Sequence, residues 1–263
     1  MKMTETYFIS HGSPEMPSSD FLEGWEEKLC LKRPKSILVI GAHWVTDEPT
    51  VNSLLDSSLD ITIDPSTNTK QVKYPAKGAP ELAKRVQELL TKSGLVKQVN
   101  VDEKRGLDQS AWDPLFFMYP MANVPVCQLS VQAHLDGAYH YNIGRALSPL
   151  LEEGVLIIGS GSATHNMDAL TTTTSGHGQL HSWAKDFDTW LEEALTSGRF
   201  EDVNNYEKKA PNAKMAHPTP EHFYPLHVAI GAAGEHAKAE LFHRNWSKGI
   251  FSNASYKFTI PTN

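Results

Sequence analysis

Three short apolar segments, each followed closely by a histidine, constrain the fold of this 263-residue chain more than any other feature. The segments are residues 6–10 before His11, residues 36–40 before His43, and residues 155–159 before His165. Unbroken apolar runs of this length are typical of strands that are buried on both faces of a parallel sheet. In open α/β sheets, ligands gather beyond the carboxyl ends of the strands. We therefore expect the three strands to bring three histidines to one edge of a sheet.

Helical patterns separate strand patterns along most of the chain. Apolar residues recur at helical spacing over residues 80–94, 138–151 and 183–198, and strand patterns cover residues 124–131 and the tail from 238 to 260. Such alternation is typical of an α/β fold. We expect a single domain over residues 1–263 with three layers, in which helices flank a central mixed, largely parallel sheet.

The composition excludes several classes of partner. A formal net charge of −7 argues against nucleic acid and against an anionic membrane surface. No apolar run approaches the roughly 20 residues that span a bilayer, and the first residues lack the pattern of a secretory signal. Two cysteines are too few for a disulfide framework. We expect a cytoplasmic protein.

His11, His43 and His222 are candidate metal ligands. Imidazole binds divalent first-row metals well, and three protein ligands that leave positions open are typical of a catalytic site. His217 lies in the same His-Pro-Thr-Pro-Glu-His segment as His222 and could replace it. The spacing fits neither a zinc knuckle nor the His-x-x-x-His face of a helical zinc protease. The residues alone therefore leave the third ligand open between His217 and His222.

His165 follows a segment of small residues, 159–164, with the sequence GSGSAT. This segment is not a dinucleotide fingerprint, because Thr164 occupies the third glycine position. Nor does it contain the Gly-x-Ser-x-Gly register of a nucleophile elbow. Small residues at this point instead allow a loop to approach a buried ligand closely. From the residues alone, His165 could be an acid/base group, a fourth ligand or a structural histidine.

Four separated motifs together resemble the class III extradiol ring-cleavage dioxygenases, and in particular their plant DOPA 4,5-dioxygenase-like branch. They are SHGSP at 10–14, AHW at 42–44, GSGSATHN at 159–166 and HPTPEH at 217–222. The resemblance also includes KRGLD at 104–108 and SYKF at 255–258, so it covers nearly the whole chain.

The resemblance implies a complete catalytic site. His11, His43 and His222 would hold a mononuclear non-haem iron(II), with zinc(II) able to take its place, and His165 would be the catalytic acid/base. The substrates would be O₂ and a DOPA-like catechol, and the product a muconate-semialdehyde-type compound of betalain or related phenolic metabolism. Several relatives are monomers, so we expect a monomer. We place three further residues in the substrate pocket: Ser13, Gln109 and His217.

Three positions depart from the family pattern. Gln109 stands where the family has a pocket histidine in the motif Leu-Asp-His-Gly-x-Trp, and a second pocket histidine is missing near Ile61. Asn166 stands where pigment-forming members commonly have proline. A glutamine side chain can donate and accept hydrogen bonds, but it cannot carry a proton charge. These departures motivate an alternative, a catalytically impaired metal-binding paralogue. A three-histidine site is also compatible with a zinc hydrolase.

Overall fold

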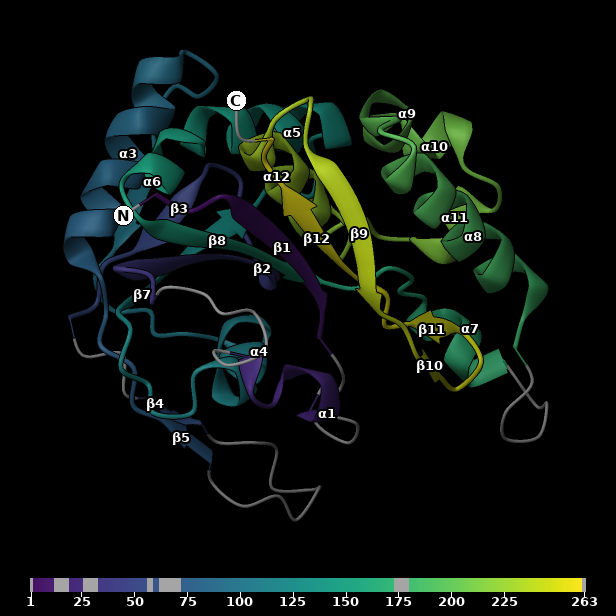
Figure 1. Cartoon of the computed structure of the whole chain (residues 1–263), viewed down its shortest axis with the longest axis horizontal. Coiled ribbons are helices and arrows are strands. Elements are labelled where there is room, and N and C mark those ends of the chain that lie inside the picture. Colours follow the sequence, from purple (N-terminus) through teal and green to yellow (C-terminus); the bar gives the residue numbers. More distant parts are fainter. Residues whose placement is uncertain are drawn as a thin grey trace.

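An eight-stranded sheet forms the centre of the molecule (Figure 1) in a computed structural model that describes residues 2–11, 19–25, 33–55, 59–61, 72–172 and 180–261. The strand order is β6-β3-β7-β2-β8-β1-β12-β9. The strands are β1 (Glu5–Ser10), β2 (Ser36–Val45), β3 (Thr50–Asn52), β6 (Asn100–Asp102), β7 (Val126–Val131), β8 (Val155–Gly161), β9 (Lys238–His243) and β12 (Ser255–Thr259). Two separate ribbons pair β4 (Leu59–Ile61) with β5 (Val72–Tyr74), and β10 (Trp246–Ser247) with β11 (Phe251–Ser252).

The centre of the sheet is parallel and its edges are mixed. The neighbours β7, β2, β8 and β1 all run parallel to one another. Strand β3 is antiparallel to β7, and β12 is antiparallel to both β1 and β9. Every residue of β7 and β8 is buried, because helices cover both faces, and this explains the unbroken apolar runs in the sequence. The predicted fold class is confirmed.

Helices form a layer on each side of the sheet (Figure 1). One layer contains α3 (Pro80–Ser93), α5 (Gly137–Leu147), α6 (Pro149–Glu152) and α12 (Tyr224–Ala233), and the other contains α1 (Ser19–Leu22) and α4 (Gln109–Met118). Helix α12 is buried on all sides because it lies between the sheet and α5. It packs on β8 and β1, and its N-terminal end therefore meets the edge of the sheet where the histidines lie.

A third group of helices contains α8 (Ser182–Thr196), which packs on β9, together with α9 (Phe200–Asn204), α10 (Tyr206–Lys209) and α11 (Ala213–Ala216) (Figure 1). Helix α7 (Met167–Thr172) lies apart from them, beside the ribbon of β10 and β11. The sequence patterns predict α8 but not α9, α10 or α11, because helices of four or five residues are too short to show an apolar stripe. The helix expected over residues 138–151 is divided into α5 and α6, since Pro149 starts a new helix. The strand expected from Val96 begins only at Asn100.

Candidate metal centre

The ends of three neighbouring parallel strands place the first two histidines. Strand β8 lies between β1 and β2, and the last residues of β1 and β8, Ser10 and Gly161, are paired. His11 comes next, and its backbone N–H donates to the oxygen of Gly161 at 3.0 Å. The ring centroids of His11 and His43 are 4.9 Å apart. The two histidines therefore flank the end of β8, as the sequence predicts.

Strand β2 continues past His43 to Val45, whereas its sequence pattern predicts that the histidine lies where the strand leaves the sheet. Its pairing with β8 ends at Gly41, and its pairing with β7 is irregular between Ile40 and Val45. This irregularity lies where His43 turns toward the site, and bulges of this kind commonly re-aim a side chain next to a functional site.

The third histidine comes from the segment that precedes α12. The backbone N–H of Ser162 donates to the oxygen of His222 at 2.9 Å. A Cβ atom on Gly161 would lie 2.0 Å from that same oxygen, and one on Gly159 would lie 2.2 Å from the oxygen of Pro225. Only glycine leaves room for this approach. The small residues of 159–161 therefore bring the backbone of His222 against the sheet edge.

Replacing Gly161 with alanine is expected to displace His222. The added methyl group overlaps a backbone oxygen, so we expect a loss of about 1–3 kcal/mol in the free energy of unfolding and a weaker affinity for divalent metal. Urea unfolding and metal titration measure the two effects. Gly198→Ala is the matched control, since Gly198 has φ of +72° and nothing within 4 Å. It should lower stability but leave metal affinity unchanged, and equal affinities in both variants would contradict the prediction.

The ring nitrogens of His11, His43 and His222 converge. One nitrogen from each lies within 4.8 Å of the others, and the Nε2 atoms of His43 and His222 are 3.1 Å apart. His11 and His222 are each only 7% exposed, whereas His43 is exposed. Two nitrogens at this separation can each lie at the roughly 2.0–2.1 Å that a metal–imidazole bond requires. This donor set therefore fits a divalent metal ion.

The surroundings of His11 and His43 favour the neutral form of these two rings, which is the form that binds metals. Desolvation and the neighbouring imidazoles lower the pKa of His11 well below its usual value. Desolvation and His222 likewise lower the pKa of His43, although the nearby Asp108 opposes this shift. Metal binding requires a neutral imidazole, so both rings are prepared for it at neutral pH.

The second nitrogen of two of these rings has a partner. Nδ1 of His11 lies 3.0 Å from Oγ of Ser160, and Nδ1 of His222 lies 3.0 Å from Oε1 of Glu221. Within the described part of the chain, Nδ1 of His43 has no such partner. The carboxylate of Glu221 can only accept, so Nδ1 of His222 carries the proton and its Nε2 keeps the lone pair that binds a metal. The hydroxyl of Ser160 can donate or accept, so it holds the ring of His11 in place without selecting its tautomer.

His165 lies directly beside this group. Its ring is stacked on that of His222, with centroids 3.5 Å apart and an interplanar angle of 8°. Burial, followed by the neighbouring His222, lowers the pKa of His165 to about 3. Neither ring nitrogen has a hydrogen-bond partner among the residues whose positions are described. A neutral imidazole with free nitrogens beside a ligand can accept a proton from a bound molecule.

A second group of potential ligands consists of His165, Glu221 and His222. The Oε1 atom of Glu221, however, already accepts hydrogen bonds from Nδ1 of His222 and from the hydroxyl of Thr219. Although burial alone would raise its pKa, the hydrogen bonds from His222, from its own backbone N–H and from Thr219 hold the pKa of Glu221 at about 2. Glu221 is therefore a hydrogen-bond partner of His222 on the Nδ1 side of the ring. These contacts favour the group of three histidines as the metal site.

His217 does not join the three-histidine group. Its Nε2 donates to the backbone oxygen of Ala163 at 2.9 Å, and its ring stacks on Phe223. It is 4% exposed, and its Nδ1 has no hydrogen-bond partner in the described ranges. Burial lowers its pKa to about 3. His217 is thus a buried neighbour of the site.

The structure describes two of the remaining positions noted in the sequence, Gln109 and Asn166, in full. Gln109 is the first residue of α4, and its buried Nε2 has no partner within the described residues. Asn166 caps α7: its Oδ1 accepts from the N–H of Ala169, and its Nδ2 donates to the oxygen of Met215. Ser13 lies outside the described residues, as does the side chain of Ile61.

Sequence reasoning missed Glu221 and an acidic network beside His43. The carboxylate of Asp108 accepts hydrogen bonds from three side chains: Arg105, Ser110 and Gln128. Both acidic residues belong to motifs that were already noted, 104–108 and 217–222. An acidic residue directly before a candidate ligand histidine is a signal that could have identified Glu221.

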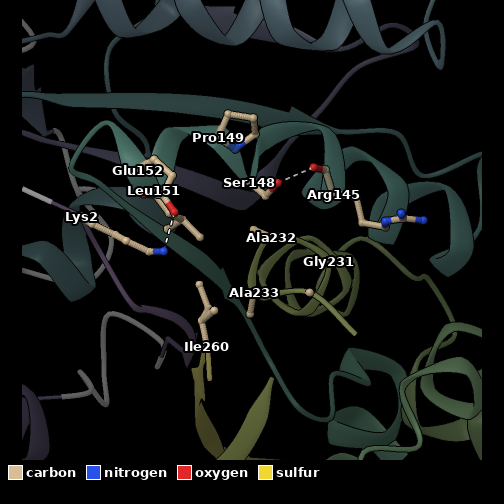
Figure 2. A pocket seen from close by; sticks show the side chains of 11 residues that line it. Lys2, Arg145, Ser148, Pro149, Leu151, Glu152, Gly231, Ala232, Ala233 and Ile260 are labelled. Atoms are coloured by element: carbon tan, nitrogen blue, oxygen red, sulfur yellow. Dashed lines mark hydrogen bonds and ion pairs between the residues drawn. The ribbon is translucent and has the colours of Figure 1, made fainter. Parts of the chain in front are cut away.

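A separate pocket contains Lys2, three residues before the start of β1, whereas His11 follows the end of that strand. Figure 2 shows the side chains that line this pocket. It is lined by residues from α5, α6 and the C-terminal end of α12, together with Lys2 and Ile260. Lys2 pairs with Glu152 there at 2.5 Å. None of the described candidate site residues lines this pocket.

Known proteins identify the family. The family model described as the catalytic LigB subunit of aromatic ring-opening dioxygenase matches residues 5–259. A Beta vulgaris protein named 4,5-DOPA dioxygenase extradiol is 58% identical over 263 residues, covering 97% of this chain and 96% of its own. A Mirabilis jalapa protein of the same name is 51% identical, with 99% and 98% covered. The crystal structure of an uncharacterized Escherichia coli K12 protein superposes with a TM-score of 0.79 at 28% identity, covering 97% of this chain and 99% of that one. The chain therefore belongs to the LigB family of aromatic ring-opening dioxygenases, as its sequence motifs indicated.

Proposed function

We propose that this dioxygenase opens the ring of a DOPA-like catechol beside one hydroxyl group, consuming O₂ and giving a muconate-semialdehyde-type product. The observation that carries the proposal is the convergence of His11, His43 and His222, with His165 stacked on His222. The names of the Beta vulgaris and Mirabilis jalapa relatives support DOPA as the first substrate to test. Betalain-type or related phenolic metabolism is the corresponding setting, and residues 1–263 form one catalytic domain.

The three histidines would hold iron(II), and zinc(II) would fit the same nitrogen donors. When bound, iron(II) would supply the redox chemistry that allows O₂ to react with a catechol. Of the three candidate ligands, His11 and His222 are buried and His43 is exposed. Small molecules would therefore reach the site from the side of His43. The protein therefore contributes a set of three imidazole ligands on one side and access for small molecules on the other.

His165 is the acid/base group in this proposal. It takes the proton of a catechol hydroxyl and returns it after the ring has opened. Its ring lies parallel to that of His222, so a substrate held beside the ligands is also beside His165. Ser13, Gln109 and His217 complete the pocket, where the free Nε2 donor of Gln109 is available to an oxygen atom of the substrate.

We further propose that the enzyme is a cytoplasmic monomer with no nucleic-acid or membrane partner. The net charge of −7 supports this view. Across the residues that the structure describes, every helix is too short or too polar to cross a membrane. Light scattering coupled to size-exclusion chromatography tests the monomer: a mass near 29.2 kDa is expected, and twice that mass would contradict it.

The direct test is anaerobic reconstitution with iron(II), followed by addition of DOPA and simpler catechols under an oxygen electrode and a visible spectrophotometer. Oxygen uptake with a yellow product is expected. Bound iron without oxygen uptake on any catechol would identify the catalytically impaired paralogue, which the missing pocket histidines favour. Hydrolytic activity with zinc in the absence of O₂ would instead identify a zinc hydrolase.

Replacing Gln109 with histidine is expected to raise kcat/KM for DOPA about tenfold, because a titratable group next to a reacting substrate typically contributes more than that. Steady-state oxygen consumption measures the change. Gln109→Asn is the matched control, since it keeps an amide and adds no titratable group. An unchanged kcat/KM in the histidine variant would show that this position does not limit turnover.

A further inference from the structure

We infer that Glu221 is a positioning residue that holds His222 in the orientation required to bind a metal ion. The inference rests on the metal site proposed above. Oε1 of Glu221 lies 3.0 Å from Nδ1 of His222 and accepts a second hydrogen bond from the hydroxyl of Thr219 at 2.9 Å. The carboxylate is thus itself fixed by Thr219, and its side chain is only 19% exposed.

The contacts of His222 leave a single nitrogen for a metal. Its backbone oxygen is bound to the N–H of Ser162, and one face of its ring is covered by His165. A carboxylate accepts hydrogen bonds only, so Nδ1 of His222 must be the nitrogen that carries the proton. The lone pair then lies on Nε2, which is the atom 3.1 Å from Nε2 of His43. Glu221 therefore selects both the tautomer and the ring orientation.

The three candidate ligands differ in the hydrogen-bond partner of their Nδ1 atom. His222 has a carboxylate, His11 has the hydroxyl of Ser160, and His43 has no partner on Nδ1 in the described part of the chain. A hydrogen bond to an ionised acceptor is roughly twice as strong as one between neutral groups. It also makes the imidazole a better electron donor, and loss of such a partner typically costs 10–100-fold in metal affinity. We therefore assign to Glu221 the largest contribution among these supporting groups.

The chain offers a matched pair for comparison. Glu235 and His236 are also adjacent in the sequence and lie 3.5 Å apart, but their side chains are 80% and 84% exposed. An exposed pair of this kind contributes little. Substitution of Glu235 thus makes the same chemical change at an exposed Glu-His pair that has no part in the proposed metal site.

The experiment titrates metal-free full-length protein with cobalt(II) and with zinc(II) against a competing chelator. It records the visible absorption of the cobalt protein and checks folding by circular dichroism. Glu221→Ala is expected to weaken affinity by about 10–100-fold and to change the cobalt spectrum. Glu221→Gln removes the charge and keeps an acceptor, so a smaller loss is expected. Glu221→Asp should partly restore affinity, and Glu235→Gln should match the wild type.

Two results would overturn the inference. Wild-type affinity and an unchanged cobalt spectrum in both Glu221→Ala and Glu221→Gln would exclude a positioning role. Metal binding that is lost in Glu221→Ala but kept in His11→Ala would make Glu221 a direct ligand in the alternative group with His165 and His222. Failure of the wild type to bind either metal is a different outcome, because it removes the proposed metal site itself.

Discussion

Replacing His165 with alanine is expected to lower kcat for catechol cleavage by at least about 100-fold while the metal content stays at the wild-type level. A positioned acid/base group typically contributes 10²–10⁴-fold to the rate. The ring of His165 covers a face of His222 but is absent from the group of three converging histidines. Its removal therefore takes away the proton acceptor and leaves the ligand set intact, with His222 still held by Glu221.

The measurement pairs oxygen consumption with metal analysis on the same purified samples. His236→Ala is the control, because His236 is 84% exposed and remote from the site. His165→Gln keeps a polar side chain without a basic ring and should be about as slow as the alanine variant. Loss of metal in His165→Ala would mean that His165 is itself a ligand, and wild-type turnover would remove it from the chemistry.

The central parallel sheet and the gathering of His11, His43 and His165 near one edge of it could be predicted from the chain alone. A strand buried on both faces needs an unbroken apolar run, and this requirement leaves a clear signal in β1, β2 and β8. The position of His11 and His43 follows directly, because neighbouring parallel strands end at the same edge. The family resemblance then supplied roles that the strand pattern does not contain.

The segment around residues 213–222 could not be placed in this way. Its position depends on backbone hydrogen bonds to the loop after β8, from His165 N–H to Ala216 oxygen and from Ser162 N–H to His222 oxygen. Such contacts join residues more than 50 positions apart and leave no periodic pattern in the sequence. The sequence shows a glycine at position 161, but it does not show that this glycine makes room for the backbone oxygen of His222.

The choice between His217 and His222 illustrates the same limit. Both lie in one six-residue segment, and residue types alone do not distinguish them. The structure separates them by what each ring contacts: His217 donates to the backbone oxygen of Ala163, while Nε2 of His222 faces Nε2 of His43. A ligand must keep a nitrogen free on the side of the metal, and among the two only His222 does so next to another candidate ligand.

Single alanine variants at these two positions are accordingly expected to differ sharply. His222→Ala should leave no measurable stoichiometric metal, because it removes one of three ligands and so one of the bonds to the ion. His217→Ala should bind metal within a few-fold of the wild type. It should instead lower the free energy of unfolding by about 2–4 kcal/mol, since it removes a buried ring packed against Phe223 and Phe187.

Elemental analysis after metal loading, together with urea unfolding of the metal-free proteins, separates the two effects. Added metal should raise the thermal midpoint of the wild type and of His217→Ala, because an ion that binds only the folded state stabilises it. It should not raise that of His222→Ala. An empty site in His217→Ala with full occupancy in His222→Ala would reverse the assignment and make His217 the third ligand. Since only one of the two rings faces His43, we expect the metal to follow His222.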